Sequence, residues 1–230
     1  EKYFGGSGYI SLAAFYKDLN DFVNTGDSFV EDFSAAALTF LTPAQQAMLD
    51  TPLGLNVINS NNGFGRIRGA EASLSVPLDL ITESLEGFGF LTSASFTDSR
   101  VTLFSGQDAT NRRTITGPGL SKWVVNSTVY FERSGFEARV SHRFRTSFLG
   151  EVAAISATRD FRTSRPESII DAQIGYAFSG SLEGLRITAQ GLNLTDEPFQ
   201  TIQGEPPDDR RLIDSQSFGR TYLIGASYSF

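Results

Sequence analysis

The chain has 230 residues, a formal charge of −7 at pH 7, a pI near 4.8 and no cysteine. This length suits one all-β domain or a part of a larger one. The acidic charge argues against a general nucleic-acid-binding protein, and without cysteine the chain can form neither disulfides nor thiolate metal sites. No run of apolar residues approaches the length of about 18 that a transmembrane helix needs. The chain opens at Glu1 with no start Met and no signal-like segment, so we expect an internal segment of a longer protein.

Apolar and polar side chains alternate along eight segments of the chain. Because successive side chains of a β-strand point to opposite faces, each segment predicts a strand with one apolar face. In chain order the predicted strands are residues 9–17, 69–78, 88–97, 123–132, 136–145, 170–178, 185–190 and 222–230. In the last strand the even positions are apolar or aromatic and the odd positions are small and mostly polar. Its length and its aromatic ends match a tilted strand that crosses a bilayer between two aromatic girdles.

The links between these strands alternate in length. Long links follow the first, third, fifth and seventh strands and cover residues 24–64, 98–121, 147–168 and 196–217. Short turns lie near residues 82–87, 133–135 and 179–184. A membrane-spanning meander has long extracellular loops and short periplasmic turns. The prediction is therefore all-β, a transmembrane antiparallel up-and-down β-barrel, ahead of a soluble β-sandwich such as a lectin.

The first long link also predicts a short helix. Thr42 offers an N-cap, Pro43 suits the first helical position, and Gln45 completes a capping box before residues 46–50. We see no linker, no second domain and no low-complexity tract in the chain.

Several motifs resemble the β-barrels of TonB-dependent receptors. They are residues 8–18, 68–71, 87–90, 95–99, 119–122, 135–139, 191–198 and the ending through Phe230. The similarity covers nearly the whole chain and is greatest to the subgroup in proteobacteria that feed on plant or algal glycans. The resemblance implies active import of a scarce nutrient across the bacterial outer membrane, powered by the TonB complex. It implies neither covalent chemistry nor a cofactor.

The resemblance also implies a barrel of about 22 strands around an amino-terminal plug that carries the TonB-contacting box. Nothing in this chain resembles the plug or the box, so residues 1–230 are expected to form the last eight strands of such a barrel. The expected partners are outer-membrane lipid, the TonB complex through the missing plug and box, a small-molecule or oligosaccharide ligand, and the barrel-assembly machinery. The assembly signal would include Tyr222, Tyr228 and Phe230.

Charged residues of both signs occupy the expected inward face of neighbouring strands. We expect them to form ion pairs that line the lumen wall and face the plug, with a direct role in substrate passage as the alternative. They are Lys17, Glu71, Glu132, Glu137, Arg139, Arg143, Arg145, Asp171 and Arg186. Small residues are frequent among the other inward positions. A closed eight-stranded barrel must fill its interior with side chains, so small residues favour a wide lumen that the plug occupies.

The long links are the expected place for ligand capture, because a sugar site combines aromatic platforms with planar polar groups. An oligosaccharide is expected ahead of a siderophore or cobalamin, although the scaffold alone cannot name the ligand. For each candidate the alternative is a solvated or loop-packing residue. The candidates are Phe29, Asp32, Phe33, Asn61, Asn62, Asp108, Asn111, Arg112, Arg159, Phe161, Arg162, Asp209, Arg210 and Gln216.

No catalytic or metal site is expected. His142 is the only histidine, and Ser141 beside it points to the opposite face of a strand, so the two cannot share a hydrogen bond. The acidic pair Asp208 and Asp209 is followed by Arg210 and Arg211, which compete with a metal for the carboxylates. The alternative to a transporter is a small, complete outer-membrane barrel with a structural or adhesion role.

Overall fold

We describe the protein from a computed structural model of residues 1–230. The structure describes residues 1–6, 8–33, 40–46, 53–105, 108–155, 158–204 and 211–229. At residues 24–29, 46, 58, 60, 62, 104–105, 108–111, 151–155 and 158–160 it describes the backbone alone. No helix among the described residues is long and apolar enough to cross a membrane.

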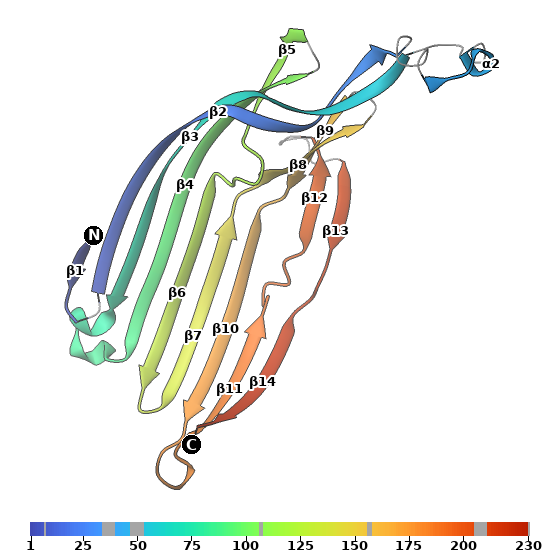
Figure 1. Ribbon diagram of the computed structural model, residues 1–230. Coiled ribbons are helices and arrows are strands. Elements are labelled where there is room, and N and C mark those ends of the chain that lie inside the picture. Colours follow the sequence, from blue (N-terminus) through green and yellow to red (C-terminus); the bar gives the residue numbers. More distant parts are fainter. Residues whose placement is uncertain are drawn as a thin grey trace.

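A large antiparallel sheet, the main sheet, forms the body of the protein (Figure 1). Its strands are β1 (Lys2–Phe4), β2 (Gly8–Asp32), β3 (Leu53–Pro77), β4 (Phe88–Ser105), β6 (Trp123–Arg133), β7 (Phe136–Arg145), β10 (Glu167–Ala177), β11 (Leu185–Leu192) and β14 (Thr221–Tyr228), with β5 (Asp108–Ile115) paired to β4. The strand order is β1-β2-β3-β4-β6-β7-β10-β11-β14, so each of the eight expected strands pairs with the next. The predicted antiparallel meander is confirmed. Among the described residues the sheet remains open, with β1 at one edge and β14 at the other.

The short turns lie at one end of the main sheet (Figure 1). The β3–β4 turn consists of the 3-10 helices η1 (Leu78–Leu80) and η2 (Glu83–Leu85), and the β10–β11 turn contains η3 (Gly180–Leu182). Between β6 and β7, Ser134 has φ 51° and Gly135 has φ 80°. Two central residues with positive φ make the hairpin turn whose twist suits antiparallel strands. A Cβ on Gly135 would lie 2.4 Å from the carbonyl oxygen of Ala177, so glycine is required there.

The apolar faces of all eight strands lie on the same side of the main sheet, which we call the outward face. The pairing shows this in two rows across the strands: Leu12–Ala72–Ala94–Val125–Phe144 and Phe131–Ala138–Ile174–Ala189–Ile224. Near the turns, the ring centroids of Phe88 and Phe131 are 4.6 Å apart, and toward the other end Phe96 and Trp123 are 4.9 Å apart. Aromatic residues thus border an apolar zone on both sides, as in a membrane barrel.

The long links fold into further strands instead of remaining open loops. Strands β2 and β3 are 25 residues long each, and their pairing continues to Asp32 and Leu53. A second sheet has the order β13-β12-β9-β8 and contains β8 (Phe148–Ile155), β9 (Thr158–Ser164), β12 (Phe199–Gln203) and β13 (Leu212–Gln216). These segments gather at the end of the main sheet opposite the short turns (Figure 1), which we call the loop end.

The described residues form one buried cluster, the loop-end core. It contains Val101 and Leu103 of β4, Ile115 of β5, Leu149 of β8 and Phe161 of β9. Leu19 and Phe22 of β2 pack against it. The core therefore joins the extended part of the main sheet to the second sheet.

Candidate ligand-capture site at the loop end

The β2–β3 hairpin carries the first long link beyond the rest of the main sheet. Near its tip, the short helix α2 (Pro43–Gln46) begins where the capping box predicts. The backbone N–H of Gln45 donates to Thr42 Oγ1 at 3.4 Å, and the N–H of Thr42 donates to Gln45 Oε1 at 2.9 Å. The two reciprocal bonds satisfy donors that a helix start leaves free. Residues 47–50 of the expected helix lie outside the described residues.

Hydrogen bonds join the second sheet to the second long link and its own segments to one another. Gly119 N–H donates to the carbonyl of Leu149 at 2.7 Å, which connects the 116–122 link to β8. Thr163 Oγ1 donates to the carbonyl of Gly204 at 2.7 Å, and Gly204 N–H donates to the carbonyl of Phe161 at 2.6 Å. The same segments contribute Ile115, Leu149 and Phe161 to the loop-end core. We call the packed links at the loop end the platform.

The fourteen candidate ligand residues fall on several elements of this platform. Asp32, Asn61, Arg112 and Gln216 are exposed on β2, β3, β5 and β13, and Phe33 and Arg162 are half-buried. The backbone positions of Phe29, Asn62, Asp108, Asn111 and Arg159 lie on β2, β3, β5, β5 and β9, without a described side chain. Asp209 and Arg210 lie outside the described residues.

Phe161 has a position that the sequence did not predict. Its side chain is only 5% exposed, and the guanidinium carbon of Arg113 lies 4.0 Å from its ring centroid. The ring is therefore buried by protein atoms, and the Arg113 guanidinium covers one of its faces. The structure gives Phe161 a packing role in the loop-end core in place of an open platform for a sugar.

The charged residues expected on the inner wall lie on the face of the main sheet opposite the outward face. Arg143 Nη2 is 3.2 Å from Asp171 Oδ2, and Arg139 Nη2 is 3.6 Å from Glu132 Oε1. Glu137 accepts hydrogen bonds from Arg186 and from Gln173 Nε2, the second at 3.2 Å. Lys17 lies over the ring of Phe15 at 5.7 Å, and Glu71 is exposed. Opposite charges thus meet in pairs. Arg143–Asp171 and Arg139–Glu132 join neighbouring strands, whereas Arg186 of β11 reaches Glu137 of β7 across β10.

Glu167 belongs to this wall although sequence reasoning assigned it to a link. It is the first residue of β10 and stands directly opposite Arg145 of β7. Arg145 Nε and Nη2 donate to the two Glu167 oxygens at 2.8 and 2.7 Å, and Phe148 lies 4.6 Å from the guanidinium. Extending the odd-numbered polar face of β10 from Asp171 back by four residues would have found it.

A small cavity of about 180 Å³ lies on this inner face beside the Arg145–Glu167 pair. It is lined by residues of β6, β7 and β10, including Asn126, Arg143 and Ile169. The arrangement places planar hydrogen-bonding groups at the loop end of the wall.

The only histidine makes its hydrogen bond on the outward face. His142 Nε2 lies 2.9 Å from Ser168 Oγ, whereas Ser141 Oγ lies 2.9 Å from Thr128 Oγ1 on the inner face. Ser141 and His142 therefore have different partners, as their alternation requires. In the described part of the chain, no group of three or more His, Cys, Asp or Glu residues could hold a metal ion.

Residues 2–194 match the family model described as TonB dependent receptor-like, beta-barrel. No curated protein and no solved structure matches the chain. The matched residues include the whole meander from β1 to β11, together with the first three long links, and end before β12, β13 and β14. The chain therefore belongs to the TonB-dependent receptor β-barrel family, whose members are transporters of the bacterial outer membrane.

Proposed function

We propose that this chain forms part of the wall and of the extracellular capture surface of a TonB-dependent importer, with an oligosaccharide as its ligand. One observation carries the proposal: all four long links meet at one end of the barrel wall and fold into a packed platform. A rigid scaffold that presents variable segments is the usual setting for a binding site.

The chemistry of the exposed residues supports a sugar ahead of a siderophore or cobalamin. Asp32, Asn61, Arg112 and Gln216 present carboxylate, amide and guanidinium groups to solvent at the loop end. Such planar groups donate to and accept from hydroxyls, and two of them can bind one hydroxylated ring in a fixed orientation. Phe33, half-buried after β2, is the remaining aromatic candidate with a described side chain, since Phe161 is buried.

The inner wall supports passage of a polar solute. Its ion pairs lie between partly exposed side chains, for example Arg143 at 59% and Arg139 at 47%. Exposed pairs contribute roughly 0–1 kcal/mol each, so they exchange partners at low cost. A plug that shifts, or a sugar that passes, can replace these contacts without a large barrier. TonB would supply the work on the plug.

The open edges of the main sheet favour a barrel completed by further strands. Open edges are not tolerated in lipid, because unpaired backbone groups have no hydrogen-bonding solvent there. We infer that residues 1–230 supply eight of about 22 strands. The barrel-assembly machinery would read Tyr222 and Tyr228 of the exposed β14, together with Phe230, which lies outside the described residues.

The second candidate function is a small, complete barrel with a structural or adhesion role. It requires β14 to close on β1 or β2, a pairing that the described residues do not show. Expression of residues 1–230 alone distinguishes the two functions. We expect aggregation, whereas a heat-modifiable, protease-resistant monomer in detergent would favour the small barrel.

Deletion of residues 27–59 from the β2–β3 hairpin tests the capture surface. Asn24 pairs with Ser60, so the deletion leaves Thr25 and Gly26 as a two-residue hairpin turn between paired positions. Leu19 and Phe22 remain on the loop-end core. We expect normal amounts of assembled protein in the outer membrane and a sharp loss of binding, measured with a panel of oligosaccharides, a ferric siderophore and cobalamin.

A matched pair of point variants refines this test. Asp32→Asn at the loop end and Glu83→Gln in a short turn both neutralise an exposed carboxylate. If Asp32 contacts ligand, its change should weaken binding by about 1–3 kcal/mol, while the Glu83 variant binds normally. Unchanged binding and uptake of every tested ligand after the deletion would show that this hairpin is not the capture surface.

A further inference from the structure

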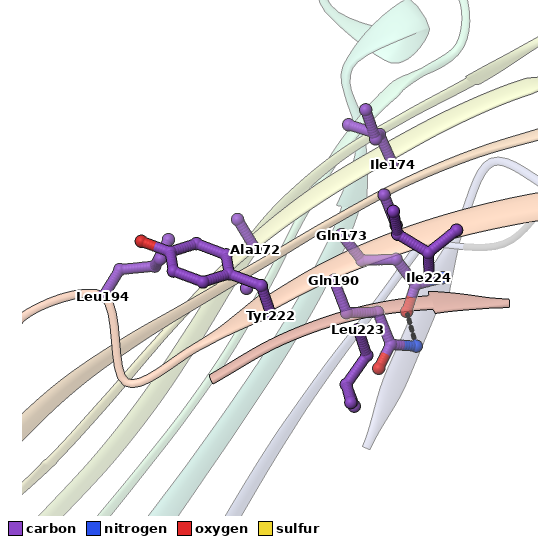
Figure 2. Close-up of a pocket in the computed structure, with 10 residues that line it drawn as sticks. Ala172, Gln173, Ile174, Gln190, Leu194, Tyr222, Leu223 and Ile224 are labelled. Carbon is purple, nitrogen blue, oxygen red and sulfur yellow. Dashed lines mark hydrogen bonds between the residues drawn. The ribbon is translucent and has the colours of Figure 1, made fainter. Parts of the chain in front are cut away.

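An apolar hollow opens on the outward face between β10, β11 and β14 (Figure 2). Its volume is about 380 Å³. This lies within the range of roughly 300–1,000 Å³ for small-molecule sites. Small residues form its floor, and larger ones surround them. The floor residues are Ala172, Ala189 and Gly191, and the surrounding residues are Ile174, Leu194, Tyr222 and Ile224.

The strand register creates the hollow. Gly191 stands between Ala172 of β10 and Tyr222 of β14, so two positions without large side chains adjoin one aromatic ring. The Leu194 side chain lies against Gly191. A Cβ at position 191 would lie 2.8 Å from Leu194 Cδ2. In Figure 2, Leu194 and Tyr222 lie side by side at one end, while Gln173 and Gln190 share a hydrogen bond of 3.1 Å. The two glutamines alternate with Ala172 and Ala189 along their strands and so belong to the inner face.

A cation stands at the Leu194 end of the hollow. Arg220 Nε donates to the carbonyl oxygen of Leu194 at 3.0 Å. The turn beneath is fixed by the Asn193 amide, which donates to the carbonyls of Glu197 at 3.1 Å and Gly219 at 3.3 Å. Within the described part of the chain, no carboxylate forms an ion pair with Arg220. The exposed guanidinium therefore keeps its charge and its two terminal nitrogens available.

We propose that the hollow binds one acyl chain of an outer-leaflet, phosphate-bearing glycolipid and that Arg220 binds the phosphate. The outward face of a family member lies against the bilayer, so hydrocarbon is what covers an apolar hollow there. Arg220 precedes β14 at the loop end, which faces the outer leaflet, and an arginine fork matches a phosphate geometrically. An apolar hollow with a cation at its headgroup end fits a lipid better than a ligand in water.

Two variants test the two halves of the site. Ala172→Leu fills the floor with an apolar side chain that the membrane tolerates, and Arg220→Gln removes the charge while keeping a donor for the Leu194 carbonyl. Ala226→Leu is the control for added bulk, since Ala226 lies on the outward face of β14 outside the hollow. Arg133→Gln is the control for lost charge, since Arg133 is exposed at the opposite end of the sheet, paired with Glu86 at 3.0 Å.

The readout is the lipid that remains with the protein purified from its native outer membrane in mild detergent. Mass spectrometry would identify the lipid, and its amount would be measured per assembled, heat-modifiable protein. We expect retained phosphorylated glycolipid in the unaltered protein, about tenfold less of it per assembled protein for Ala172→Leu and for Arg220→Gln, and no change in the two controls.

Three results would overturn the proposal. One is equal retention by the unaltered protein and both test variants, which would mean unspecific annular lipid. Another is an equal loss in the controls. A retained glycerophospholipid in place of the glycolipid would refute the assigned source. Ligand binding at the loop end should be normal in both test variants, so this outcome does not depend on the proposed function.

Discussion

Apolar side chains occupy two regions of this protein that differ in what surrounds them. In the loop-end core, Val101 is 1% exposed and Leu103 is 3% exposed, and both are covered by other protein segments. On the outward face of the main sheet, Ile224 is 86% exposed and Leu12 is 71% exposed. In the loop-end core, large apolar side chains are buried, as in a water-soluble domain. On the outward face of the main sheet, large apolar side chains are exposed instead.

The difference shows which solvent each region meets. Burial of apolar surface away from water stabilises the loop end. In the main sheet, lipid supplies the apolar surroundings, and the strand pairing satisfies the backbone groups that lipid cannot. Only the segments that project past the membrane need a core of their own. The platform is therefore a small folded unit built onto a wall whose outward face, over the described residues, is not covered by protein.

The largest expected effect comes from a charge in the loop-end core. Val101→Asp would bury an unpaired carboxylate among Leu103, Ile115 and Leu149, at a cost of roughly 3–5 kcal/mol. We expect early proteolytic cleavage of the loop end and loss of ligand binding, while the barrel wall still assembles. Val23→Asp is the control, because Val23 also lies toward the loop end, on β2, but is 53% exposed. Equal protease sensitivity of the two variants would show that the core does not hold the platform together.

The next effect is on the outward face. Ile224→Arg should cost roughly 2–4 kcal/mol near the bilayer midplane and reduce the amount of assembled protein. Ser227→Arg changes the opposite face of the same strand, where Arg186 is its paired neighbour, and should be far milder. Heat-modifiable mobility after membrane extraction measures both. Similar losses would mean that the two faces of β14 are wrongly assigned.

The sequence predicted the main sheet well because one strong, local signal specifies it. A strand with one face in lipid must alternate, and the short turns keep neighbouring strands consecutive. The turn at Ser134 and Gly135 and the cap at Thr42 were also predictable, since a few adjacent residues determine each of them.

The loop end was less predictable because its strands are polar and its contacts are distant in the chain. Residues 59–63 read Asn-Ser-Asn-Asn-Gly, a turn-like composition, yet they continue β3 because β2 pairs with them. The alternation of Leu53, Leu55 and Val57 was a signal that the sequence reading missed. Burial of Phe161 depends on β4, β5 and β8, and no local pattern reports such contacts. Its ring therefore looked like an exposed platform from sequence alone.

The smallest effect is expected where side chains meet neither lipid nor a protein core. Glu137 and Arg186 form an ion pair on the inner face, with side chains 16% and 45% exposed. Solvent screens such pairs, so Glu137→Gln and Arg186→Gln should each lower stability by about 0–1 kcal/mol. In the Glu137→Gln variant, Gln173 can still donate to the side-chain amide oxygen at position 137, which limits the loss further. A double-mutant cycle of thermal unfolding in detergent, at low and at high salt, measures the coupling between the two residues. A coupling energy as large as the cost of Ile224→Arg, and insensitive to salt, would mean that this pair is shielded from water. The inner wall would then contribute as much to stability as the outward face.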